Sequence, residues 1–256
     1  INAKENNPEL DIIILEKGKD VLQKVKISGG GRCNVTHACF EPKELVKFYP
    51  RGEKELLGPF HQFMTGDTFE WFDNKGVPLK IEADNRVFPE ANTSQAIIDC
   101  FQKAVEKLKI KVFTNHGVNS VYRQENKWII NTKSQVFEAD KLVIAAGSSK
   151  KVWQLCESLD HAIIAPVPSL FTFNINDKRL LDLLGTSVPN ATVKISNTKL
   201  EASGPLLITH WGMSGPAVLK LSAFGARILA DKNYQYNVEV NWLSRPTAKV
   251  LNVLLN

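Results

Sequence analysis

The chain has 256 residues, of which 43% are hydrophobic and 23% charged, a composition typical of a globular protein. Its net charge is +5, but no run of lysine and arginine forms a basic stripe, which argues against nucleic acid as a partner. No apolar run approaches the length of about 20 residues that crosses a bilayer, and four cysteines without framework spacing favour a reducing cytoplasm.

The first pattern along the chain is "LDIIILEKG", residues 10–18. Its continuous apolar character predicts a short strand that is buried on both faces, as in a parallel sheet. Glu16 stands where this strand would leave the sheet. In dinucleotide-binding folds an acid at the end of the second strand binds the ribose hydroxyls, and the glycine motif G-x-G-x-x-G precedes it. We expect that motif to precede Ile1; the plainer alternative is that "EKG" only ends a strand.

Three consecutive glycines follow in "KISGGGRCN", residues 26–34. Glycine has no Cβ, so its backbone N–H groups can approach a phosphate or a flat ring closely. The guanidinium of Arg32 suits phosphate, while Cys33 and Asn34 offer a polarisable sulfur and an amide. Flexible linkers are usually longer and do not continue into Arg-Cys-Asn. We therefore predict that this segment contacts a ligand.

Helical patterns occupy much of the next sixty residues. Pro42 lies near the start of one predicted helix, and "GDTFEWFDNKG" predicts another, capped by Asp67 or Thr68 and ended by Gly76. The aromatic residues of "FEWF" are interpreted as core. The clearest helix is predicted over residues 94–109, because its apolar residues recur every three or four positions after a Thr-Ser cap.

Alternating patterns then predict a β-meander made of "VNSVYRQE", "KWIINTKS" and the beginning of "QVFEADKLVIAAG". The last part, residues 141–147, is apolar throughout and predicts a strand that returns to the parallel sheet. It ends in Ala145, Ala146 and Gly147, whose small side chains permit close approach of a ligand.

From residue 166 the pattern changes to short strands with irregularly spaced prolines and glycines. This predicts a second domain over residues 166–244 with an antiparallel barrel or sandwich. The stretch "DKRLLDLLG" predicts a short helix and "GPAVLKLSAFGARILA" a longer one. Residues 245–256 look like the start of a helical insertion.

The cysteines offer two further hypotheses. Cys33, His37 and Cys39 have a spacing that could suggest zinc, but a structural zinc site needs four ligands, so we predict no metal. Cys33 as a redox thiol would lack the second cysteine of a C-x-x-C motif.

Two other polar residues leave alternatives open. His210 can face a substrate, although a hydrogen-bonded structural histidine is the more common case. Arg86 can hold a substrate carboxylate or pair with Asp84 nearby.

Four segments in order resemble one known family. "ILEKGK" with "KISGGGRCNVTH", "ADNRVFPEANTSQAIID", "ADKLVIAAGSS" and "GPLLITHWGMSGPAVLKLS" are similar to motifs of bacterial NAD(P)/FAD-dependent oxidoreductases. That family includes aminoacetone oxidase and the bile-acid-reducing flavoproteins. The resemblance covers nearly the whole chain, except the glycine motif before Ile1 and the C-terminal part.

The resemblance implies an α/β fold, with a Rossmann-like FAD-binding domain over residues 1–165 and the β-rich domain after it. It implies FAD as cofactor and a small-molecule substrate, with NAD(P)H as a transient co-substrate or oxygen as acceptor. No catalytic residue is assigned. The implied cofactor-binding residues are Glu16, Lys17, Lys24, Ser28, Gly29, Gly30, Gly31, Arg32, Cys33, Asn34, Val118, Ala145, Ala146 and Gly147.

A rival hypothesis from another class is a non-catalytic module that binds a flavin or nucleotide and contacts a partner. Flavin content and reduction by NADH distinguish the two, because the flavin carries the chemistry of such enzymes.

Overall fold

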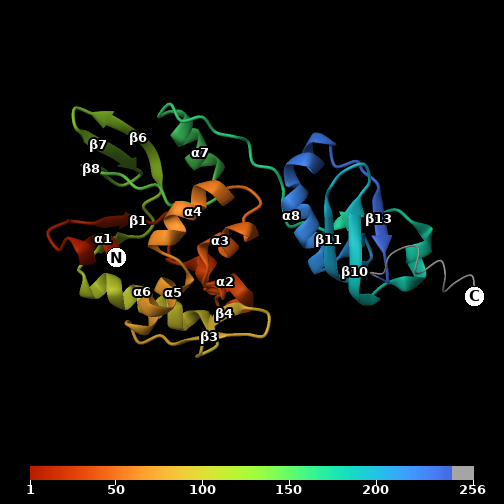
Figure 1. Cartoon of the computed structure of the whole chain (residues 1–256). Coiled ribbons are helices and arrows are strands. Elements are labelled where there is room, and N and C mark those ends of the chain that lie inside the picture. The colour runs from red at the N-terminus through yellow and green to blue at the C-terminus, as the bar shows by residue number, and fades with distance from the viewer. Residues whose placement is uncertain (244–256) are drawn as a thin grey trace, which may run out of the picture. The chain divides into compact units, whose positions relative to one another are not determined.

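A computed structural model describes residues 1–243, so the helical element expected over residues 245–256 lies outside the described residues. The chain divides into two units, Ile1–Ile163 and Ile164–Asn256 (Figure 1). No helix within residues 1–243 has the length and apolar character needed to cross a bilayer.

The parallel sheet of the first unit consists of β1 (Ile13–Leu15) and β5 (Lys111–Phe113). Ile14 pairs with Val112, and their side chains are 41% and 37% exposed. The expectation that the first strand is buried on both faces is therefore wrong. A strand is buried on both faces only where other elements cover both sides of its sheet. Within the described residues, Ile14 and Val112 instead line an open cavity.

In the sequence, α6 (Ser94–Lys107) comes shortly before β5, and it confirms the predicted helix. The Thr93 hydroxyl accepts a hydrogen bond from the Gln95 N–H at 3.3 Å, so the predicted cap is formed. One face of the helix packs into a core cluster with α5 (Thr65–Asp73). The buried members of this cluster are Cys33, Phe72, Ile97 and Cys100. The core interpretation of "FEWF" thus holds for its second phenylalanine.

α5 begins earlier than its predicted cap residues. The Asp67 carboxylate accepts a hydrogen bond from the Met64 N–H at 2.7 Å, so Asp67 caps the helix from its third position. Gly76 follows the helix with φ of +73°, a left-handed conformation that suits a helix end.

The first unit contains further short elements. A helical turn at the predicted Pro42 start is formed, and a three-stranded antiparallel sheet has the order β2–β4–β3. The elements are α1 (Asn2–Asn6), α2 (Gln23–Gly31), β2 (Thr36–His37), α3 (Pro42–Leu45), η1 (Val46–Phe48), α4 (Glu53–Gln62), β3 (Leu79–Ile81), β4 (Arg86–Pro89) and α7 (Lys150–Glu157).

The predicted meander is confirmed as β6 (Val118–Gln124), β7 (Lys127–Thr132) and β8 (Val136–Ala139), seen as adjacent antiparallel strands in Figure 1. The predicted strand over residues 141–147 is wrong, because this segment has no regular structure. Val143 within it is 85% exposed. An extended segment becomes a strand only when a neighbouring strand takes its backbone hydrogen bonds. In the described part of the chain, β1 pairs with β5 alone.

The second unit is a five-stranded antiparallel sheet with the order β13–β10–β11–β12–β9. Its strands are β9 (Phe173–Asn174), β10 (Ser187–Ile195), β11 (Glu201–Thr209), β12 (Gly212–Ser214) and β13 (Val238–Asn241). α8 (Pro216–Asp231) lies against the sheet (Figure 1) and buries the apolar face predicted for it. The predicted helix in "DKRLLDLLG" is a 3₁₀ helix, η2 (Lys178–Leu183). The chain thus contains an antiparallel half-barrel in addition to a mixed α/β unit with a parallel strand pair, which agrees with the predicted fold class.

Candidate functional site

The three glycines form a left-handed turn at the end of α2. Ser28 leaves the helical conformation with ψ of 151°, and Gly29, Gly30 and Gly31 have φ of +55°, +68° and +83°. A Cβ at Gly29 would lie 2.6 Å from the Asn34 nitrogen, so the fold itself excludes a side chain there. At Gly30 and Gly31, by contrast, no described atom lies within 4 Å of the Cβ position. Two neighbouring glycines thus present bare backbone to open space.

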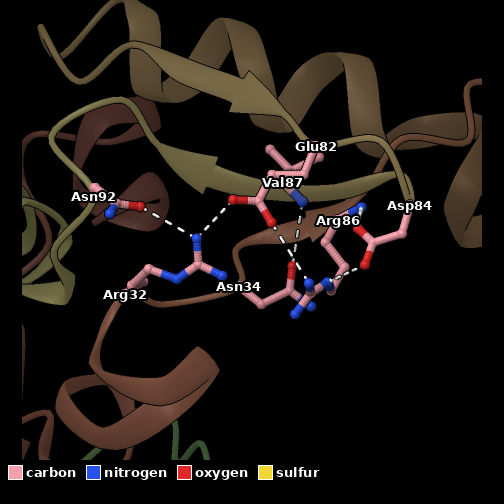
Figure 2. A network of polar contacts seen from close by, with 7 residues as sticks. All are labelled: Arg32, Asn34, Glu82, Asp84, Arg86, Val87 and Asn92. Atoms are coloured by element: carbon pink, nitrogen blue, oxygen red, sulfur yellow. Dashed lines mark hydrogen bonds and ion pairs between the residues drawn. The ribbon is translucent and has the colours of Figure 1, made fainter.

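Arg32 ties this turn to the hairpin of β3 and β4. Its guanidinium stacks on the ring of Phe88 with 3.9 Å to the ring centroid, and Phe88 is fully buried. Nη1 donates to the Glu82 carboxylate at 2.6 Å and to Asn92 Oδ1 at 3.2 Å, as Figure 2 shows. The guanidinium that was predicted to suit phosphate therefore binds a carboxylate of the same unit through Nη1. Arg32 acts in this structure as a support for the glycine turn.

Arg86 shares the same carboxylate and adopts the second of its two predicted roles. Its Nε donates to Asp84 at 2.7 Å, and its Nη2 lies 3.5 Å from Glu82 Oε2 (Figure 2). Desolvation opposes the charged form of Asp84, but hydrogen bonds from the backbone and side chain of Arg86 outweigh it and lower its pKa. Glu82 and Phe88 were missed by sequence reasoning, since no local pattern links them to Arg32.

The residues after the glycines belong to the protein interior or its framework. The Cys33 side chain is 8% exposed and packs in the core cluster with Phe72, Ile97 and Cys100, so its thiol does not face solvent as a redox group would. Asn34 Oδ1 accepts a hydrogen bond from the Val87 N–H at 3.3 Å. Among the residues that the structure describes, no three His, Cys, Asp or Glu side chains gather as metal ligands.

Glu16 and Lys17 lie beside the turn that precedes Val118. The His116 N–H donates to the Glu16 carbonyl at 2.8 Å, and a Cβ at Gly117 would lie 3.1 Å from Lys17 Cγ. Glu16 Oε1 accepts from the Gly18 N–H at 2.6 Å, whereas Oε2 has no hydrogen-bond partner within residues 1–243. One carboxylate oxygen therefore stays available to a hydroxyl group.

A second pair of predicted residues is brought together from distant parts of the chain. Gly147 has φ of +63°, and its Cβ position lies 3.1 Å from the ammonium group of Lys24. Residues 145–147 are exposed. Lys24 lies in the first turn of α2, and the glycine turn follows the helical part of the same element. Ser28 lies between them, and its hydroxyl donates to the Val25 carbonyl at 2.8 Å.

A cavity in the first unit is built mostly from other residues. It has a volume of about 600 Å³ and a mostly apolar lining that includes Ile14, Trp71 and Phe101. Of the predicted site residues, only Glu16 reaches it. A ligand site normally adds a few polar groups to an apolar wall, and here the polar side chains of the lining are Asn2, Glu16, Thr68 and Gln102.

Comparison with known proteins gives consistent matches. A family model described as the HI0933-like protein Rossmann domain matches residues 1–228. The 3-dehydro-bile acid delta(4,6)-reductase of Clostridium scindens is 23% identical over 266 residues, which cover 100% of this chain and 64% of that protein. The ribosomal RNA dihydrouridine synthases of Escherichia coli and Haemophilus influenzae are 27% and 25% identical over 83% of this chain. The alignments cover 54% and 55% of those two proteins, so the chain spans about half to two thirds of these relatives' length.

Proposed function

The chain belongs to the HI0933-like Rossmann family, as its motifs predicted, and we propose that it is part of an FAD-dependent reductase of carbon–carbon double bonds. The observation that carries the proposal is the open glycine turn, where Gly30 and Gly31 have left-handed backbones and free space in place of a side chain. Backbone of this kind admits a flat or phosphorylated ligand at contact distance.

The donor set along this path suits a dinucleotide that carries phosphates and a ribose. The Lys24 ammonium supplies a positive charge for phosphate next to Gly147, and the exposed backbone of the glycine turn adds N–H donors. The free Oε2 of Glu16 can accept from ribose hydroxyls. Arg32 serves the site indirectly, since its ion pair with Glu82 holds the turn in position.

A bound flavin supplies hydride-transfer chemistry, while the protein supplies binding, orientation and electrostatics. The relatives' names indicate the kind of bond to be reduced. The double bonds of a 3-dehydro bile acid and the ring double bond of uridine are each conjugated to a carbonyl group. We therefore propose a small substrate with a conjugated carbonyl as the acceptor. Overall, one NAD(P)H and one proton are consumed, and two hydrogens are added across the double bond.

The test begins with purification of the full-length protein that contains this chain. We expect it to carry flavin absorbance that NAD(P)H bleaches without oxygen and that a conjugated carbonyl compound restores. A full-length protein that is colourless and takes up no flavin on incubation would contradict the proposal.

A matched pair of variants tests the glycine turn itself. Gly30→Val is expected to remove most of the bound flavin, because its side chain would occupy the open space. Gly76→Val is the control, since Gly76 also has a positive φ and open space at its Cβ position but lies after α5 and is not part of the glycine turn. Equal flavin content in both variants would show that the turn does not contact the cofactor.

A further inference from the structure

A tryptophan at the surface of the second unit contributes nothing to its core. Trp211 is 75% exposed, more than any other tryptophan of the described chain. It forms, with His210, the two-residue turn between β11 and β12, whose flanking residues Thr209 and Gly212 pair with each other. A large apolar side chain held in water is a common mark of a binding surface.

The turn that carries Trp211 is held firmly by its neighbours. The Ile175 N–H donates to the Trp211 carbonyl at 2.8 Å, and Gly212 pairs with Asn174 of β9. A Cβ at Gly212 would lie 2.4 Å from the Phe173 carbonyl oxygen, so the two strands approach as closely as glycine allows. Because the backbone of Trp211 is already fixed on both sides, binding of a ligand to its side chain loses little backbone conformational entropy.

A pocket of about 330 Å³ lies beside this turn. Its wall combines the exposed indole with the apolar side chains of η2 and with several amide, hydroxyl and imidazole groups. Within residues 1–243, the side chains of Asn174, Asn176 and His210 have no hydrogen-bond partner. His210 thus has no hydrogen bond within residues 1–243 that would hold it as a structural residue, and its role stays a prediction.

The pocket offers little net charge to a ligand. Its one carboxylate, Asp177, accepts hydrogen bonds from the Arg179 guanidinium at 2.6 and 3.0 Å and from the Arg179 N–H at 2.9 Å. The lining also contains Lys178, whose positive charge offsets the negative charge of Asp177. Asparagine side chains each offer both donors and an acceptor, which complement carbonyl and amide groups. The volume is at the low end of the range for small-molecule sites, about 300–1,000 Å³.

We propose that this pocket binds a flat, uncharged ring bearing carbonyl or amide groups, which stacks on Trp211 and bonds to Asn174 and Asn176. Aromatic side chains stack on such rings regardless of their exact substituents, and the amides then select for carbonyl and N–H groups. The identification of this ring with the reductase's substrate rests on the proposed function, whereas the binding itself does not.

Titration calorimetry of the full-length protein with uridine tests the proposal, because uridine has a flat ring with two carbonyl groups and no charge. We expect saturable binding that Trp211→Leu weakens by about fivefold or more, the range of losses for base–aromatic stacking. Asn176→Leu should weaken it less. Dihydrouridine, whose ring is no longer flat, should bind more weakly than uridine.

Trp242→Leu is the matched control, since Trp242 lies in the same unit, is 36% exposed and does not line the pocket. The affinity of the Trp242→Leu variant for uridine should equal that of the wild type. Absence of saturable uridine binding, or equal losses in the two tryptophan variants, would overturn the proposal. Flavin content, measured on the same samples, separates the two hypotheses: flavin without uridine binding refutes only the pocket, and uridine binding without flavin refutes only the reductase.

Discussion

Gly212 and Gly215 of the second unit differ from Gly30 and Gly31 of the first in what surrounds them. In the second unit, Gly212 and Gly215 are surrounded by backbone, with Cβ positions 2.4 Å from the Phe173 oxygen and 2.7 Å from the Pro205 oxygen. In the first unit, Gly30 and Gly31 have nothing around them within the described residues. The crowded glycines are required by packing inside the unit. The open glycines are favoured by their left-handed backbone, and the space beside them admits a ligand from outside.

The largest effect is expected at a crowded glycine. Gly212→Ala places a methyl group against backbone atoms that cannot move independently, and we expect a loss of about 3 kcal/mol or more in the unfolding free energy of the second unit. Gly185→Ala is the control, since its φ is +82° but its Cβ position is open. Urea denaturation of both variants measures the difference. Equal losses of unfolding free energy would show that left-handed backbone strain alone, and not crowding, explains the need for glycine at position 212.

The same comparison can be made within the glycine turn. Gly29→Ala brings Cβ to 2.6 Å from the Asn34 nitrogen, so we expect a loss of about 2–3 kcal/mol in the stability of the first unit. Gly30→Ala should lose only about 1 kcal/mol, the cost of a Cβ in a left-handed conformation. Thermal unfolding with and without added FAD measures both. A Gly30→Ala variant as unstable as Gly29→Ala would remove the distinction between the two positions.

A smaller effect is expected from the ion pair that supports the turn. Glu82→Gln removes the charge that Arg32 and Arg86 share, and because the Glu82 and Arg32 side chains are 27% and 29% exposed we expect a loss of about 1 kcal/mol. Glu44→Gln is the control, since its pair with Lys47 is about 60% exposed and contributes little. Chemical denaturation compares the two. A Glu82→Gln protein of wild-type stability would mean that stacking on Phe88 is enough to hold Arg32.

The smallest effect concerns pH and the wall of the second-unit pocket. Hydrogen bonds from the Arg179 side chain and N–H lower the pKa of Asp177 from 3.8 to about 2. A lowered carboxyl pKa stabilises the fold above the unfolded value, and that contribution is lost as pH falls from about 4 towards about 2. Asp177→Asn should therefore unfold with a flatter pH dependence in this window. Identical pH profiles of melting temperature for variant and wild type would contradict this.

Local patterns predicted the elements whose cause is local. The helix expected over residues 94–109 is found as Ser94–Lys107, because its apolar spacing and its threonine cap act within a few residues. The meander was predicted for the same reason, as alternation and polar turns define hairpins between adjacent strands. The family was also evident from short motifs, and the match over residues 1–228 agrees with it.

The failures came where a partner far along the chain decides the outcome. The apolar run over residues 141–147 predicted a strand, but apolar composition indicates only that a segment can be buried, not that a neighbour is present to pair with it. The contact of the Arg32 guanidinium with Glu82, fifty positions later in the chain, was likewise not predicted, while phosphate binding by Arg32 stays a prediction. Neither the presence of a neighbouring strand nor the contact between Arg32 and Glu82 leaves a pattern in the sequence around the residues concerned.

The sequence by itself determined the fold class, the family and the segments that carry the candidate site, since periodicity, capping and glycine content act over short distances. The tertiary structure decided which of those residues remain available to a ligand. It placed Cys33 in the core, bound Arg32 to Glu82, left Gly30 and Gly31 bare and displayed Trp211 on a fixed turn. Availability depends on what surrounds a side chain in space, and that is set by contacts between residues far apart in the chain.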